Sequence, residues 1–175
     1  MSGHNKWSQI KHKKAKTDAH KSKQFSKLSR LITEEVRKAK GNGNAPGVRT
    51  AIERGRAVNM PNDAIDRAIK KATESSEGLE MVTYEAYGPG GCAMIIEVFT
   101  ANKNKAAQEI KHILVRNNHP LASPGSASWT FRREGIQWIP TTTVALGDAD
   151  LALLEKLVDE LEDNEEVQEV FTNVE

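Results

Sequence analysis

The first thirty residues constrain the fold of this chain most, because they cannot supply a hydrophobic core. They contain nine Lys or Arg residues against a single acid, Asp18, together with three histidines and Trp7. Positive charge at this density attracts polyanions. We therefore predict a nucleic-acid-binding basic arm, in which residues 1–17 are extended and flexible and the ring of Trp7 is exposed.

The two halves of the chain carry opposite charge. Residues 1–78 hold 18 Lys or Arg and 8 Asp or Glu residues, a balance of +10, whereas residues 79–175 hold 7 and 16, a balance of −9. The formal net charge of +1 for all 175 residues conceals this difference. The asymmetry indicates a basic half that binds a polyanion and an acidic half with another role.

Composition also indicates the cellular compartment in which the protein is expected. The single cysteine, Cys92, permits no internal disulfide, which favours a reducing environment. No apolar run approaches the roughly 20 residues of a membrane-spanning helix. The basic N-terminus lacks the apolar core of a secretory signal, and it is rich in Lys and His rather than in Arg as a transit peptide would be. We expect a soluble cytoplasmic protein without a membrane partner.

Helical periodicity dominates residues 18–78. An amphipathic helix is predicted from Asp18 to just before Gly41, since its apolar residues recur at helical spacing: Phe25, Leu28, Leu31, Ile32 and Val36. The Gly- and Asn-rich residues 41–47 form a loop. A second short helix follows, and Pro61 suits the first turn of a third helix over residues 61–72. The sequence thus predicts a three-helix domain over 18–78.

From Met81 onward the pattern changes to mixed strands and helices. Strands are predicted over 81–87, 92–99, 126–131, 135–139 and 167–172, and helices over 103–117 and 148–161. Two strand–helix–strand passages with short links are typical of a ferredoxin-like layer of helices on a sheet. The predicted fold class is therefore α+β: a basic flexible arm (1–17), a three-helix domain (18–78) and a ferredoxin-like α+β domain (79–175).

Several motifs resemble those of the YebC/PmpR family, which includes mitochondrial translational activators of cytochrome oxidase. They lie in order along the chain: Gly3-His4-Asn5-Lys6-Trp7, Asn59-Met60-Pro61, Tyr84–Gly91, Asn102–Lys105 and Gly125-Ser126 before Trp129-Thr130-Phe131. The resemblance implies a helical domain and two α+β domains, one inserted within the other. Here Phe131–Gly135 runs almost directly into Ile136–Pro140, so this chain resembles a short form that lacks the inserted domain near 132–136.

The predicted nucleic-acid-binding residues combine lysines that neutralise phosphates with an aromatic ring that stacks on a base. They are His4, Lys6, Trp7, Lys11, His12, Lys13, Lys14, Lys16, Lys21, Lys23, Lys27, Arg67, Lys70, Lys71, Lys103 and Lys105. Residues 61–72 could be a recognition helix, but they offer few side chains that read base edges, which favours phosphate contacts.

Lys103 and Lys105 pose a separate question, because cations at a helix N-terminus oppose the helix dipole. A bound phosphate would explain their position, whereas Asn102 alone would serve as a plain N-cap.

Enzyme chemistry and metal binding find no support in the sequence. His4, His12 and His20 are spaced eight apart without a cysteine or carboxylate cluster. Gly88-Pro89-Gly90-Gly91 lacks the Lys-Ser/Thr of a phosphate loop and is read as a tight turn. Cys92 lies in an apolar strand with no base nearby in sequence. We expect a non-enzyme with no catalytic residue, metal, cofactor or small-molecule substrate.

Three functions remain open at this stage. The first is a ribosome-associated translation factor that contacts rRNA or tRNA and eases elongation at difficult sequences such as proline runs, as the resemblance to the mitochondrial branch implies. The second is a DNA-binding transcriptional regulator, and the third is a protein–protein adaptor acting through the acidic half. A long lysine-rich arm with few base-edge readers favours RNA over DNA.

Overall fold

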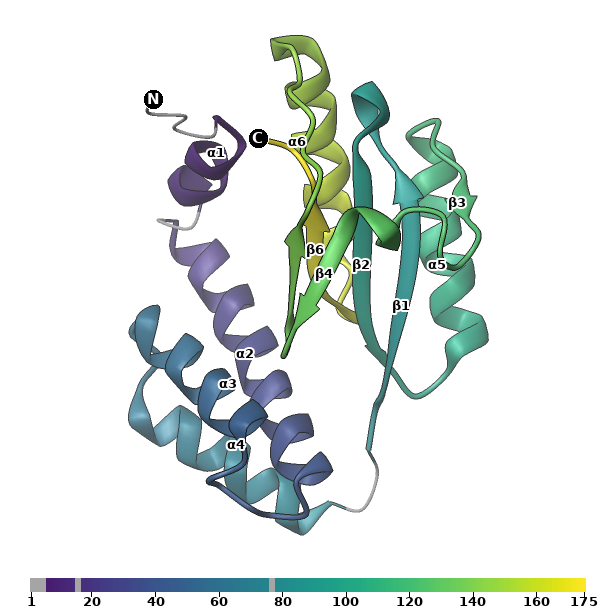
Figure 1. Cartoon of the computed structure of the whole chain (residues 1–175). Helices are drawn as coiled ribbons and strands as arrows, with labels where there is room; N and C mark the ends of the chain where they lie inside the picture. Colours follow the sequence, from purple (N-terminus) through teal and green to yellow (C-terminus); the bar gives the residue numbers. More distant parts are fainter. Residues whose placement is uncertain (1–5, 15–16, 76–77) are drawn as a thin grey trace. The chain divides into compact units, whose positions relative to one another are not determined.

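The computed structural model describes residues 6–14, 17–75 and 78–175. The chain divides into two compact units (Figure 1). Residues 14–79 form a helical unit, and residues 80–175 form a sheet unit to which the N-terminal helix also belongs. The predicted α+β class, with helices first and an antiparallel sheet with helices after them, is confirmed.

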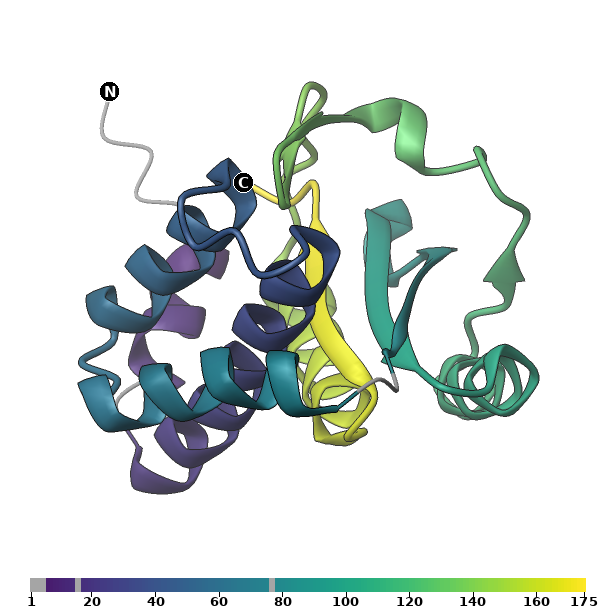
Figure 2. The same cartoon turned by 90° about the horizontal axis from the view of Figure 1, so that it is seen from below.

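Three helices build the helical unit: α2 (Asp18–Lys38), α3 (Pro46–Ala57) and α4 (Asn62–Glu74). Helix α2 begins after Thr17, whose hydroxyl oxygen accepts a hydrogen bond from the His20 backbone N–H at 3.3 Å, the usual chemistry of an N-cap. Helix α2 packs against both α3 and α4 (Figure 2). The buried residues between them are Leu28, Leu31, Ile32, Val36, Val48, Ala51, Ile65 and Ala68.

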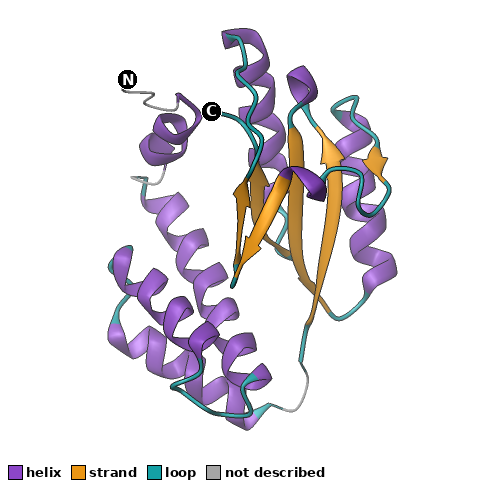
Figure 3. Cartoon of the chain, in the orientation of Figure 1, coloured by secondary structure: helices purple, strands orange, loops and turns teal. Residues whose placement is uncertain are grey.

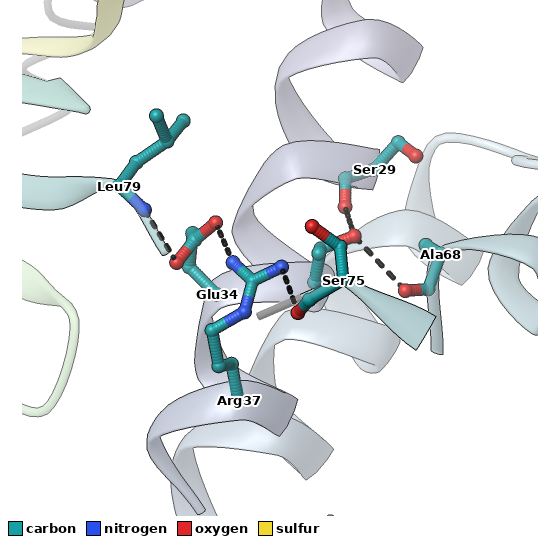
Figure 4. Close-up of polar contacts among 7 residues, drawn as sticks. Ser29, Glu34, Arg37, Ala68, Ser75 and Leu79 are labelled. Carbon is teal, nitrogen blue, oxygen red and sulfur yellow. Dashed lines mark hydrogen bonds and ion pairs between the residues drawn. The ribbon is translucent and has the colours of Figure 1, made fainter. Parts of the chain in front are cut away.

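Polar contacts join α2 to α4 and to the segment that follows it (Figure 4). The Thr33 hydroxyl lies 2.9 Å from the Ala68 carbonyl oxygen. Arg37 donates to the Ser75 carbonyl oxygen at 3.3 Å and forms an ion pair with Glu34. The other carboxylate oxygen of Glu34 accepts from the Leu79 backbone N–H at 3.3 Å. Helix α2 is thereby bonded to the middle of α4, to the residue that caps the C-terminus of α4 and to the segment that leaves the unit.

The sheet unit contains a four-stranded antiparallel sheet with strand order β3-β1-β2-β6. Its strands are β1 (Glu80–Tyr87), β2 (Ala93–Thr100), β3 (Leu121–Ala122) and β6 (Val167–Thr172). Strand β2 continues through α5 (Lys103–Arg116) into β3, and β1 lies between those two strands, which makes a split βαβ unit.

The two faces of the sheet are covered differently (Figure 2). Met94, Ile96 and Val98 point into the main core with α5 and α6 (Asp148–Asp163). Ala93 and Ile95 point the other way, toward Phe131. A hairpin of β4 (Phe131–Glu134) and β5 (Gln137–Pro140) covers this second face (Figure 3). Because β2 is buried on both faces, its sequence is almost continuously apolar.

The prediction that residues 1–17 are extended is wrong for residues 6–14, which form helix α1 (Lys6–Lys14). The prediction that Trp7 is exposed is also wrong: its side chain is 6% exposed and belongs to the main core of the sheet unit. Burial of the large indole ring outweighs the repulsion among the neighbouring lysines. The predicted extended structure at residues 15–16 and 1–5 lies outside the described residues.

Two strand predictions also need correction. A strand is predicted over residues 126–131, but Ser128–Thr130 make a 3-10 turn, η2, and the strand starts only at Phe131. The Thr130 backbone N–H bonds to the Ala127 carbonyl oxygen at 3.1 Å, which closes this turn. The strand predicted over 135–139 occupies 137–140, because Gly135, with a φ of 60°, lies in the hairpin turn. Strand β3 is too short to show an alternating pattern.

Candidate nucleic-acid interface

The lysines of α1 are partly engaged by the sheet unit. Lys6 forms an ion pair with Asp148, and its hydrogen bond lowers the pKa of that carboxyl. Lys11 donates to the Val170 carbonyl oxygen at 3.2 Å and lies 5.7 Å from the centroid of the Trp7 ring. Lys13 is exposed. With its ring buried, Trp7 has no face on which a base could stack, so the predicted stacking role is replaced by a packing role.

Four of the predicted residues receive no side-chain description. His4 and Lys16 lie outside the described residues, and His12 and Lys14 are described only through the backbone of α1. Their participation in nucleic-acid binding stays a prediction.

The helical unit carries the remaining predicted cations on two helices. On α2, Lys21 and Lys23 are exposed and Lys27 is half-buried. On α4, Arg67, Lys70 and Lys71 are all exposed. Lys70 lies 3.5 Å from Glu74, and Arg67 donates to the Asp63 carbonyl oxygen at 3.2 Å. An exposed ion pair such as Lys70–Glu74 contributes at most about 1 kcal/mol, so a phosphate can compete for Lys70.

Sequence reasoning missed two arginines on α3. Arg49 and Arg56 are exposed and lie seven residues apart, a spacing that places them on the same face of a helix. This seven-residue spacing, outside the buried stripe of Val48, Ala51 and Gly55, is the sequence pattern that could have predicted them. Basic residues therefore occur on every helix of this unit.

The balance of charge on the helical unit is positive. Residues 14–79 contain 15 Lys or Arg and 8 Asp or Glu residues, a balance of +7. Two of those acids, Glu34 and Glu35, are largely buried and pair with Arg37 and Lys38 on the same helix. The surface that faces solvent is consequently richer in cations than in acids, which is the electrostatic character of a phosphate-binding protein.

The basic pair at the start of α5 has a structural explanation. The Asn102 side chain accepts from the Lys105 backbone N–H at 3.0 Å and caps the helix. Lys103 lies 2.6 Å from Glu80, whose hydrogen bond raises the pKa of this lysine. Lys105 lies 3.5 Å from Glu109 and 3.8 Å from Glu166. These carboxylates balance the cations at the helix N-terminus, so no bound phosphate is needed there.

Among the residues that the structure describes, no three His, Cys, Asp or Glu side chains gather in an arrangement that could hold a metal ion. Cys92 is buried, and burial raises the pKa of its thiol to about 11. A thiol with this pKa is a poor nucleophile near neutral pH. No helix among the described residues is long and apolar enough to cross a membrane.

Comparison with known proteins places both units in one family. Residues 5–75 match the family model described as TACO1/YebC protein N-terminal domain. Residues 79–137 and 134–174 match the model described as TACO1/YebC second and third domain. The two segments of the second match meet at the turn between β4 and β5, which is where the sequence predicts the inserted domain to be missing.

Curated relatives cover nearly the whole chain. A protein of Petrotoga mobilis is 44% identical over 176 residues, which are 98% of this chain and 70% of the relative. One of Fervidobacterium nodosum is 37% identical over 235 aligned residues, 99% of this chain and 93% of the relative. Both are named probable transcriptional regulatory protein.

A solved structure shares the fold as well. It is titled as a conserved hypothetical protein, Aq1575, from Aquifex aeolicus. It is 30% identical to this chain with a TM-score of 0.79, and the match covers 97% of this chain and 96% of that one.

Proposed function

The chain belongs to the TACO1/YebC family, and from this premise we propose that it is a non-enzymatic regulator of gene expression that binds RNA on the ribosome. The observation that carries the proposal is the charge of the helical unit, +7 over residues 14–79, with exposed cations on α2, α3 and α4. Contacts of this kind release counterions from a phosphate backbone and give affinity without sequence selectivity.

RNA is favoured over duplex DNA by what the helices offer for recognition. A protein that reads the major groove places several base-edge donors and acceptors at the start of one helix. Helix α4 begins with Asn62 and Asp63, and its exposed cations come later, at Arg67, Lys70 and Lys71. This arrangement suits phosphate contacts to a folded RNA, and rRNA or tRNA on the ribosome supplies such a surface in quantity.

The names of the relatives support a second candidate, a DNA-binding transcriptional regulator. In that case α4 would lie in the major groove, and Arg67 would be the first side chain to test for base contacts. Crosslinking of the full chain in growing cells, followed by sequencing of the attached nucleic acid, separates the two. Reads concentrated in rRNA and tRNA support the translation role, whereas discrete promoter fragments overturn it in favour of transcription.

A charge-reversal experiment tests the interface itself. The double variant Arg49→Glu/Arg56→Glu should bind ribosomal RNA more weakly, with a salt dependence whose slope falls by about 2, one for each phosphate that is no longer neutralised. The matched control is Lys111→Glu/Lys156→Glu, which changes the charge equally on exposed positions of α5 and α6. An equal reduction of affinity in both double variants would refute a specific interface on the helical unit.

A further inference from the structure

Two aromatic side chains of the sheet unit are exposed although tryptophan and tyrosine usually bury most of their rings. Among the described residues, Trp129 is 66% exposed and Tyr87 is 38% exposed. Trp7 and Trp138 are by contrast buried or half-buried in the cores on the two faces of the sheet. Leaving an indole in water forgoes burial of a large apolar surface, so the exposure of Trp129 calls for a physical reason.

The two exposed side chains converge on one backbone atom. The Tyr87 hydroxyl and the Trp129 indole N–H both donate to the Ser126 carbonyl oxygen, at 2.5 Å and 2.9 Å. The polar atoms of both side chains therefore point toward the protein, where each already donates a hydrogen bond. What each ring offers to solvent is its apolar face and edge, which recognise a partner by stacking rather than by hydrogen bonding.

A buried carboxylate holds the loop that presents Trp129. Glu85 is buried, and its carboxylate accepts hydrogen bonds from the backbone N–H groups of Gly125, Ala127 and Ser128 at 2.7, 2.8 and 2.8 Å. The Thr130 hydroxyl adds a bond to the Ala127 carbonyl oxygen at 2.8 Å. The exposed ring is thus fixed before any partner binds, which reduces the entropy lost on binding.

The sequence segment that contains the loop differs in charge from the rest of its unit. Residues 79–175 have a balance of −9, yet residues 117–147 contain only one acid, Glu134, against Arg132 and Arg133. Arg132 is exposed on β4, two residues after the turn that carries Trp129, and its ion pair with Glu134 is itself exposed, so a phosphate can compete for this arginine. A rigid exposed aromatic pair in an acid-poor segment, next to an exposed arginine, fits a nucleobase with its phosphate better than it fits an acidic or purely apolar partner.

We propose that Tyr87 and Trp129 form a stacking platform for an unpaired base of single-stranded RNA, with Arg132 near the adjoining phosphate. The proposal rests on the RNA-binding function proposed above and adds a second contact, in the sheet unit, of a different chemistry. The helical unit contributes phosphate contacts that depend strongly on salt, whereas stacking on Trp129 depends on the presence of a base.

The experiment measures binding of fluorescently labelled, unstructured 12-nucleotide RNA to the full chain by anisotropy. Trp129→Ala should weaken binding about 5- to 150-fold, the range found for removal of one base–aromatic stack. Trp129→Phe, which keeps a ring, should retain most of the affinity. Leu153→Ala, which removes another exposed apolar side chain from the same unit, is the control and should bind like the wild type.

A second arm separates stacking from charge. An RNA of the same length with abasic nucleotides keeps every phosphate but has no base, so wild-type protein should bind it as weakly as Trp129→Ala binds the normal RNA. Equal affinity of wild type and Trp129→Ala for the normal RNA, with both proteins folded by circular dichroism, overturns the platform and points to a protein partner for this surface. Failure of the wild type to bind any RNA instead overturns the proposed function.

Discussion

Replacement of Trp7 by alanine should release helix α1 from the sheet unit. The indole is 6% exposed and packs into the core formed by the sheet with α5 and α6. Trp7→Ala removes this large apolar contact. Two polar contacts of α1, the exposed pair between Lys6 and Asp148 and the hydrogen bond from Lys11 to Val170, would then contribute too little to hold the helix in place.

The magnitude follows from the buried area. A tryptophan side chain buries roughly 200 Å². At about 25 cal/mol per Å² this corresponds to ~5 kcal/mol, an upper estimate because the unfolded chain is itself partly compact. A helix of nine residues is too short to persist alone in water, so α1 should unfold once its tryptophan is removed. We expect the free energy of unfolding of the sheet unit to fall by about 3 kcal/mol.

Hydrogen exchange resolved by residue is the appropriate assay, because a two-unit chain need not unfold in one step. In the wild type the amides of α1 should be protected beyond the first turn, and in Trp7→Ala they should exchange at unprotected rates, while α2, α3 and α4 keep their protection. Lys13→Ala, an exposed position on the same helix, serves as control. If Trp7→Ala leaves exchange and stability unchanged but weakens RNA binding, Trp7 is an exposed stacking residue and the reasoning is refuted.

Three further changes test contacts elsewhere in the fold. Glu85→Ala leaves three backbone N–H groups of the Trp129 loop without their acceptor. Each unsatisfied N–H costs about 1–3 kcal/mol, so the free energy of unfolding of the sheet unit should fall by at least ~3 kcal/mol in urea. The fluorescence emission of Trp129 should change as well. Burial raises the pKa of Glu97, so ionisation of this carboxyl disfavours the folded state as pH rises above the ordinary range of a glutamate, about pH 4. The stability of Glu97→Gln should therefore increase relative to wild type as pH rises above that range in urea unfolding, and a stability difference that does not change with pH would contradict the assignment. Thr33→Val leaves the Ala68 carbonyl oxygen without this donor and should destabilise the helical unit by about 1 kcal/mol in hydrogen exchange, whereas Thr50→Val, at an exposed hydroxyl on α3, should have a smaller effect.

Local sequence determined the elements whose apolar residues repeat at a regular spacing. The stripe from Leu28 to Val36 defined α2, and the apolar run that begins at Ala93 defined a strand buried on both faces. In each case the spacing of the apolar residues along the chain reports which face is buried, although the strand still needs partners such as β6, far away in the sequence, for its backbone hydrogen bonds. The α+β class followed from the order of these elements. Charge, which needs no structure to count, already divided the chain into a basic and an acidic half.

Only the tertiary structure decided which aromatic side chains are buried and which are exposed. Trp7 stands among lysines, a setting typical of exposed residues, yet it is buried by residues more than seventy positions away in the sequence. Trp129 falls within a predicted strand, but Glu85, on a distant strand, holds its loop and leaves the ring in solvent. Lys103 and Lys105 likewise find their carboxylates on other elements as well as on α5. These outcomes depend on partners that only the folded chain brings together, so no local pattern could reveal them.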